Sequence, residues 1–140
     1  MEIVEKDRKI LAILKENARA SIRDIAKKTS LRPSTVHHRI QRLDKEGVIE
    51  KFTVKLNNDA VGENFIVFIL VKTNKNLEGK LLHDQRIKEV FGVTGGFDLM
   101  IKCKFKDIID FNDFIIKFRK QDGIGATETL VSTLTLKEEL

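Results

Sequence analysis

Hydrophobic residues recur at helical spacing in three short stretches near the start of the chain. The first stretch covers residues 7–15, the second residues 21–29 and the third residues 33–47. The second opens at Ser21, and Asp24 follows three positions later, which is typical of a capping-box start. The pattern therefore predicts three closely spaced helices, and the last two form the layout of a helix-turn-helix.

The third predicted helix separates apolar from polar positions. It begins near Pro33, a residue favoured in a first helical turn, and ends at Gly47, a good C-terminal cap. Its apolar side is formed by Val36, Ile40 and Leu43. Projection at about 100° per residue places Arg39 near this apolar side and predicts an outward or flanking position for the other polar side chains. These are Ser34, Thr35, His37, His38, Gln41, Arg42 and Lys45.

The spacing of apolar residues changes after the three predicted helices. Residues 48–56 alternate apolar and polar positions, which predicts a half-buried strand, and Asn57-Asn58-Asp59 predicts a turn or hinge. No return strand follows directly, so this strand must pair elsewhere in the chain or with its copy in a second subunit.

The remaining sequence alternates strands and helices. Strands are predicted at residues 65–73, 91–94, 97–105 and 126–136, and helices at residues 77–90 and 107–120. We expect the first helix to bury Leu77, Leu81, Leu82, Ile87 and Val90, and the second Ile108, Phe111, Ile115 and Phe118. This order predicts a ferredoxin-like βαββαβ domain. The fold class is α+β, with a helix-turn-helix domain at 1–48, a linking strand and hinge at 49–64 and the ferredoxin-like domain at 65–140.

Charge is distributed unevenly between the two halves. Residues 1–60 hold 14 Lys and Arg against 9 Asp and Glu, whereas residues 61–140 hold 12 of each. The whole excess of +5 therefore belongs to the helical half, which favours a polyanionic partner. The longest apolar run has seven residues, too few for a membrane helix. A single cysteine and a start unlike a signal peptide predict a cytoplasmic protein.

The polar side of the third helix has the chemistry needed to bind double-stranded DNA. We expect Thr35, His38 and Gln41 to contact base edges in a major groove. Cationic side chains would contact phosphates, and the candidates are Lys28, Arg32, Arg42 and Lys45. Adjacent helical residues point about 100° apart, so His37 and His38 are interpreted as surface imidazoles. We predict no metal site and no cofactor.

The segment from Leu31 to Ile49, read as LRPSTVHHRIQRLDKEGVI, strongly resembles the recognition helix of the Lrp/AsnC family of transcription regulators. Asp7–Leu11, Asn17–Arg19 and Asp24–Lys28 match the family's upstream pattern. The resemblance implies sequence-specific DNA binding, a homodimer paired through the linking strand, and assembly to octamers. Arg32 departs from the Ser or Thr usual at this N-cap, and we hypothesise that it contacts a phosphate instead.

The stretch between the predicted strands around residue 95 is a candidate ligand site. Two adjacent glycines can bring backbone amides close to a ligand, and Asp98 could meet an ammonium group, although Gly-Gly is also common in plain hairpin turns. The stretch resembles the family's effector-sensing motif, which implies binding of an amino-acid-like effector at contacts between dimers. Gly96 departs from the acidic residue often found there. The candidate effector residues are Thr94, Gly95, Gly96, Phe97 and Asp98.

An enzyme is the alternative interpretation, because sirohaem decarboxylases resemble these regulators in both halves of the fold. The second half of the chain, however, holds a single histidine, His83, and no tyrosine. No nucleophile with its base stands out, and Cys103 falls on the inward-facing side of a predicted strand. We therefore predict a regulator and not an enzyme.

Overall fold

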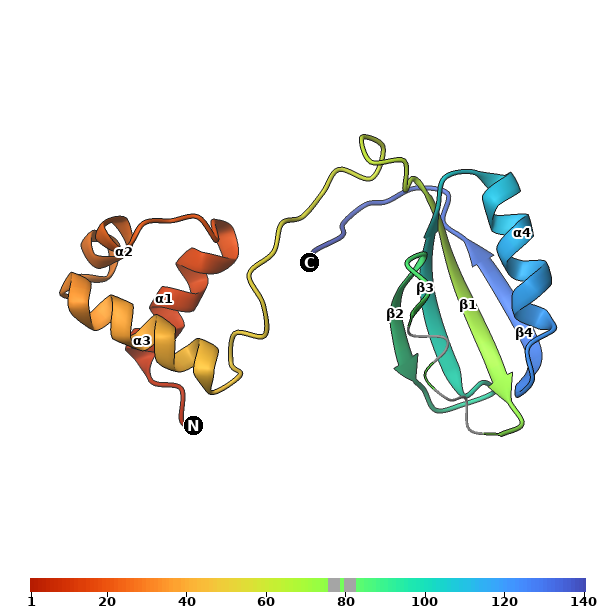
Figure 1. Cartoon of the computed structure of the whole chain (residues 1–140), viewed down its shortest axis with the longest axis horizontal. Helices are drawn as coiled ribbons and strands as arrows, with labels where there is room; N and C mark the ends of the chain where they lie inside the picture. Colours follow the sequence, from red (N-terminus) through yellow and green to blue (C-terminus); the bar gives the residue numbers. More distant parts are fainter. Residues whose placement is uncertain (76–78, 80–82) are drawn as a thin grey trace. The chain divides into compact units, whose positions relative to one another are not determined.

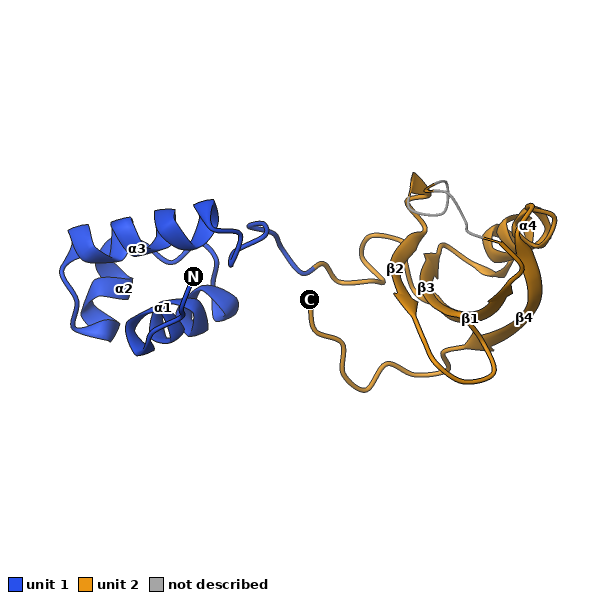
Figure 2. Cartoon of the chain, turned by 90° about the horizontal axis from the view of Figure 1, so that it is seen from below, with its two compact units in different colours: residues 1–55 blue, residues 56–140 orange. Residues whose placement is uncertain are grey.

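The computed structural model describes residues 1–75, 79 and 83–140. The chain divides into two compact units, residues 1–55 and residues 56–140, which Figure 2 shows in blue and orange. The first unit is helical and the second is built on a sheet.

The first unit contains the three predicted helices (Figure 1): α1 at Glu5–Glu16, α2 at Ile22–Thr29 and α3 at Pro33–Lys45. Ser21 begins α2 as expected, since its Oγ accepts a hydrogen bond of 3.0 Å from the Asp24 backbone N–H. Gly47 follows α3 with a φ of +74°, the left-handed conformation that ends helices. The three helices meet in a core of Ile10, Ile25, Ala26 and Val36.

The linking segment differs from the prediction, because residues 50–56 form no strand in the single chain. Its alternating apolar side chains are exposed rather than half-buried: Phe52 is 52%, Val54 67% and Leu56 55% exposed. An extended segment becomes a strand only when a neighbour takes its backbone hydrogen bonds, and none of the described strands pairs with it.

In the second unit, the described residues form a four-stranded antiparallel sheet in the order β2-β3-β1-β4. Its strands are β1 at Phe65–Thr73, β2 at Ile87–Gly92, β3 at Leu99–Phe105 and β4 at Ile124–Val131. Helix α4, at Ile108–Arg119, lies against one face of the sheet (Figure 1). The arrangement is the α+β fold expected from the pattern, and β4 ends five residues earlier than predicted.

The prediction of a helix reaching residue 90 is wrong, since Ile87 and Val90 belong to β2. The register of β2 shifts between Ile87 and Glu89, so Ile87 pairs with Cys103 and Val90 with Ile101. This irregularity spaces two inward apolar residues three positions apart, which imitates a helical pattern. The predicted positions Leu77, Leu81 and Leu82 lie outside the described residues.

Helix α4 packs its aromatic side chains onto the sheet. Phe114 and Phe118 are nearly fully buried and stack with ring centroids 5.4 Å apart. Ile108 was predicted to be buried but is 58% exposed, because it occupies the first turn beside the capping residue Asp107. Phe114 takes its place in the core, which also contains Phe105 and Ile115.

The face of the sheet opposite α4 combines apolar residues with a charged cluster. Phe68 and Leu70 are half-buried there, whereas Phe91 and Leu130, which pair with neighbours on the same face, are exposed. Glu138, from the C-terminal segment, bridges Lys102 at 2.6 Å and Lys104 at 3.0 Å. Hydrogen bonds from Lys102, Asn58 and Lys104 lower the pKa of Glu138 to about 2.

The contact between β4 and β1 leaves no room for a side chain at Gly125. A Cβ atom at this position would lie 2.8 Å from the backbone oxygen of Lys72. Gly125→Ala is therefore expected to displace the strands and lower the free energy of unfolding by about 1–3 kcal/mol, as measured by chemical denaturation.

Gly92→Ala is the matched control, because a Cβ at Gly92 would meet no atom within 4 Å. Equal stability of the Gly125 and Gly92 variants would contradict the close contact between β1 and β4.

Candidate nucleic-acid interface

Helix α3 presents the predicted polar side chains on the surface of the first unit. Val36 and Leu43 are fully buried on its inner side, which turns the opposite side of the helix outward. Thr35 is half-buried at the edge of this surface. The other predicted residues of α3 are exposed: Ser34, His37, His38, Gln41, Arg42 and Lys45. The structure therefore brings seven predicted residues together on one helix.

The two histidines of α3 stay accessible as hydrogen-bonding groups. Their rings lie edge to face with centroids 5.8 Å apart, and both side chains are exposed. Within residues 1–75, 79 and 83–140, no three His, Cys, Asp or Glu residues gather where they could hold a metal ion. An imidazole in this position can donate to or accept from a base edge.

Arg32 stands at the start of α3 without capping it. It is the N-cap residue, and its side chain makes no capping hydrogen bond, while Pro33 occupies the first helical turn. The exposed guanidinium therefore extends from a helix N-terminus, where free backbone N–H groups and the helix dipole also attract anions.

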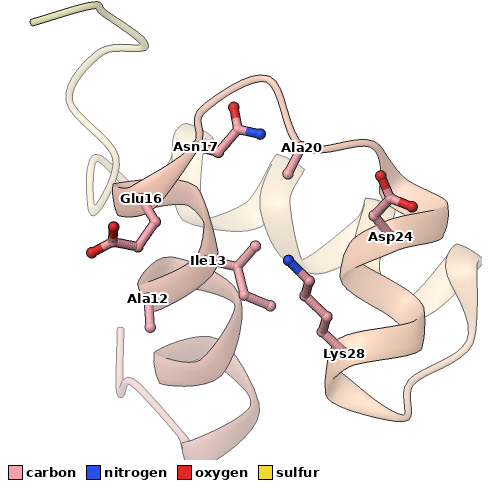
Figure 3. A pocket seen from close by; sticks show the side chains of 7 residues that line it. All are labelled: Ala12, Ile13, Glu16, Asn17, Ala20, Asp24 and Lys28. Carbon is pink, nitrogen blue, oxygen red and sulfur yellow. The ribbon is translucent and has the colours of Figure 1, made fainter.

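Lys28 lies at a groove between α1 and α2, as Figure 3 shows. The groove has a volume of about 290 Å³ and is lined by side chains of α1, α2 and the turn that joins them. Ile13 contributes to its apolar lining, and Glu16 and Asp24 stand beside it. Lys28 thus belongs to a different part of the unit from the seven α3 residues.

An ion pair that the sequence reasoning missed connects α1 with α3. Arg39 donates from Nη1 to Asp7 Oδ1 at 2.9 Å, and the Asp7 side chain is only 1% exposed. Asp7 also accepts a hydrogen bond of 3.2 Å from the Val4 backbone N–H through Oδ2. The position of Arg39 near the apolar side of α3 was the available signal, but its partner is 32 residues away in the chain.

The candidate effector residues lie in the loop between β2 and β3. Thr94, Gly95 and Gly96 are exposed and Phe97 is half-buried. Gly95 has a φ of +114°, which only glycine adopts readily.

Asp98 closes this loop onto β1. Its Oδ2 accepts hydrogen bonds from the Thr73 backbone N–H at 2.8 Å and from Thr73 Oγ1 at 3.3 Å. Its backbone N–H donates to Val71 O at 2.9 Å, and its carbonyl oxygen accepts from Val93 N–H at 2.9 Å. Asp98 therefore anchors the loop to β1, and the ammonium contact expected of it stays a prediction.

Cys103 is a core residue of the sheet. It is fully buried, and desolvation raises the pKa of its thiol to about 12, so the reactive thiolate form is strongly disfavoured. No helix among the described residues is both long and apolar enough to span a membrane.

A helix-turn-helix unit with a polar, cationic α3, joined to a ferredoxin-like unit, defines the class of two-part DNA-binding regulators. Comparison with known families agrees for both units. Residues 4–50 match the family described as winged helix-turn-helix DNA-binding, and residues 66–140 match the Lrp/AsnC ligand binding domain. The chain belongs to the Lrp/AsnC family and is a DNA-binding transcription regulator, not an enzyme.

Individual relatives cover nearly the whole chain. An HTH-type transcriptional regulator of Pyrococcus furiosus is 36% identical over 99% of this chain and 97% of its own length. Another, FL11 of the same organism, is 35% identical over 94% of this chain and 90% of its own length.

Solved structures share the fold. The structure of E. coli AsnC has a TM-score of 0.89 at 25% identity, covering 100% of this chain and 98% of that one. The transcriptional regulator of Neisseria meningitidis in complex with L-Met has a TM-score of 0.91 at 21% identity, covering 99% and 94%.

Replacing Arg32 at the uncapped start of α3 should change stability and DNA affinity in opposite directions. Arg32→Ser supplies a capping hydroxyl and is expected to raise the free energy of unfolding by about 1 kcal/mol. The same variant loses a cation at the helix N-terminus. It should bind duplex DNA several-fold more weakly, the effect of losing about one phosphate contact. Thermal unfolding and titration of a fluorescent duplex measure the two effects.

Arg119→Ser, which removes an exposed cation from the end of α4, is the control for the change in charge. An Arg32→Ser protein that binds DNA as tightly as the Arg119→Ser protein would refute a phosphate contact by Arg32.

Proposed function

We propose that this regulator reads its DNA site through the outer side of α3. The observation that carries the proposal is the accessible row of hydroxyl, imidazole, amide and guanidinium groups on a helix whose opposite side buries Val36 and Leu43. In the proposed assignment Thr35, His38 and Gln41 contact base edges. Ser34 and His37 flank them, and phosphates are contacted by Lys28, Arg32, Arg42 and Lys45.

The functional form proposed here is a homodimer that assembles further, with an octamer as the expected end state. The linking segment supports this form, because its exposed Phe52, Val54 and Leu56 alternate on an extended backbone without a partner strand in the described chain. Pairing with the same segment of a second copy would bury these side chains and satisfy the backbone. Exposed Phe91 and Leu130 support a second contact through the sheet face opposite α4.

An amino-acid-like effector is the proposed ligand of the second unit. Support comes from the match of residues 66–140 to a ligand binding domain and from the similar Neisseria meningitidis regulator, which was solved with L-Met. The exposed loop of Thr94, Gly95 and Gly96 offers backbone amides to a carboxylate, with Phe97 and Asp98 beside it. We place this regulator in the cytoplasm.

Replacing one base-reading and one phosphate-contacting residue separates the two proposed roles. His38→Ala should relax the sequence preference, measured as the ratio of affinities for a selected and a scrambled duplex, by about tenfold or less per site. Lys28→Ala should lower the affinity for both duplexes by the same factor, because a phosphate contact carries no sequence information. Identical losses on both duplexes for both variants would contradict the assignment.

A further inference from the structure

The ion pair between Asp7 of α1 and Arg39 of α3 is a buried, charged contact with a defined hydrogen-bond geometry. Among the described residues, Asp7 is the only charged side chain in the buried class. Its partner Arg39 is 27% exposed and sits in the middle of α3, between the buried Val36 and Leu43.

The apolar contacts of α3 determine which side of the helix faces inward, but they leave small rotations and sliding of the helix less restricted. Val36 packs into the core with Ile10, Ile25 and Ala26, and aliphatic contacts of this kind are non-directional. A charged hydrogen bond of 2.9 Å has a preferred geometry at both ends and is strong when shielded from water. It therefore restricts rotation and sliding of α3 against α1.

Asp7 is itself held in place. Its Oδ2 accepts from the Val4 backbone N–H at the start of α1, which leaves Oδ1 directed to Arg39 Nη1. One carboxylate thus secures the first turn of α1 and the middle of α3 together. The Nε atom of Arg39 is buried and has no hydrogen-bond partner in the described structure, so the Nη1 contact is what compensates the buried part of the guanidinium.

We propose that Asp7 is a positioning residue for DNA recognition, which sets the orientation of α3 through its ion pair with Arg39. The proposal rests on the proposed reading of DNA by α3. In this proposal Arg39, a cation on the recognition helix, holds α3 in place and does not contact DNA. Base contacts depend on side-chain placement within a groove, so a loosened α3 loses discrimination between sequences before it loses attraction to phosphates.

The test uses the full chain and two duplexes, one selected from random sequence by the wild-type protein and one scrambled version of it. Asp7→Asn keeps the size of the side chain and an oxygen for Val4 N–H but removes the charge that holds Arg39. We expect the affinity ratio between the two duplexes to fall about tenfold, the discrimination of roughly one base pair. Affinity for the scrambled duplex should stay unchanged or rise.

Asp44→Asn is the matched control, since it removes one exposed carboxylate from the same unit and raises the net charge equally. It should leave the affinity ratio at the wild-type value. Arg39→Lys, which can retain the ion pair, should preserve most of the ratio, whereas Arg39→Met should lower it as Asp7→Asn does.

Measurements are made well below the unfolding temperature of every variant, so that loss of folded protein does not contribute. If Asp7→Asn does not fold, the comparison of Arg39→Lys with Arg39→Met decides the proposal. A wild-type ratio in Asp7→Asn, or equal ratios in the two Arg39 variants, would overturn it. A wild-type protein that fails to distinguish the duplexes would instead overturn the proposed reading by α3.

Discussion

Burial of the aliphatic side of α3 is the constraint on which the recognition surface depends. Val36 and Leu43 are fully enclosed, and Val36 shares a core with Ile10 and Ile25. Because helical residues four positions apart lie on one face, burial of this side places the polar residues on the opposite side of α3 at the surface. The same burial brings Arg39 against Asp7, so the hydrophobic contacts and the ion pair act on one helix from the same side.

Local sequence signals predicted the elements that depend on local interactions. Ser21 begins α2 and Gly47 ends α3 because capping depends on a few neighbouring residues. Features that depend on distant partners were missed or misjudged. The pairing of Asp7 with Arg39 has no short-range signature, and the shifted register at Ile87 was mistaken for a helical period. The strand expected at 48–56 needs a neighbouring strand, and the described part of the chain does not supply one.

The same distinction between local and long-range interactions applies to the candidate DNA-binding and effector residues. Periodicity predicted which side of α3 is exposed, since exposure there follows from the buried stripe. It did not predict that Lys28 borders a groove between α1 and α2, or that Asp98 anchors its own loop to Thr73. Both facts depend on packing between elements. In the second unit, the hydrogen bonds of Asp98 tie the loop to β1, and the loop carries Gly95 at a φ of +114°.

If the cations of the first unit face duplex DNA, binding depends steeply on salt concentration, because each neutralised phosphate releases counterions. A dimer that neutralises about eight phosphates should give a plot of log K against log salt concentration with a slope of about −7. The measurement needs no knowledge of the operator, because phosphate contacts form on any duplex. A slope near zero, with the protein folded throughout, would show that these cations do not contact phosphates.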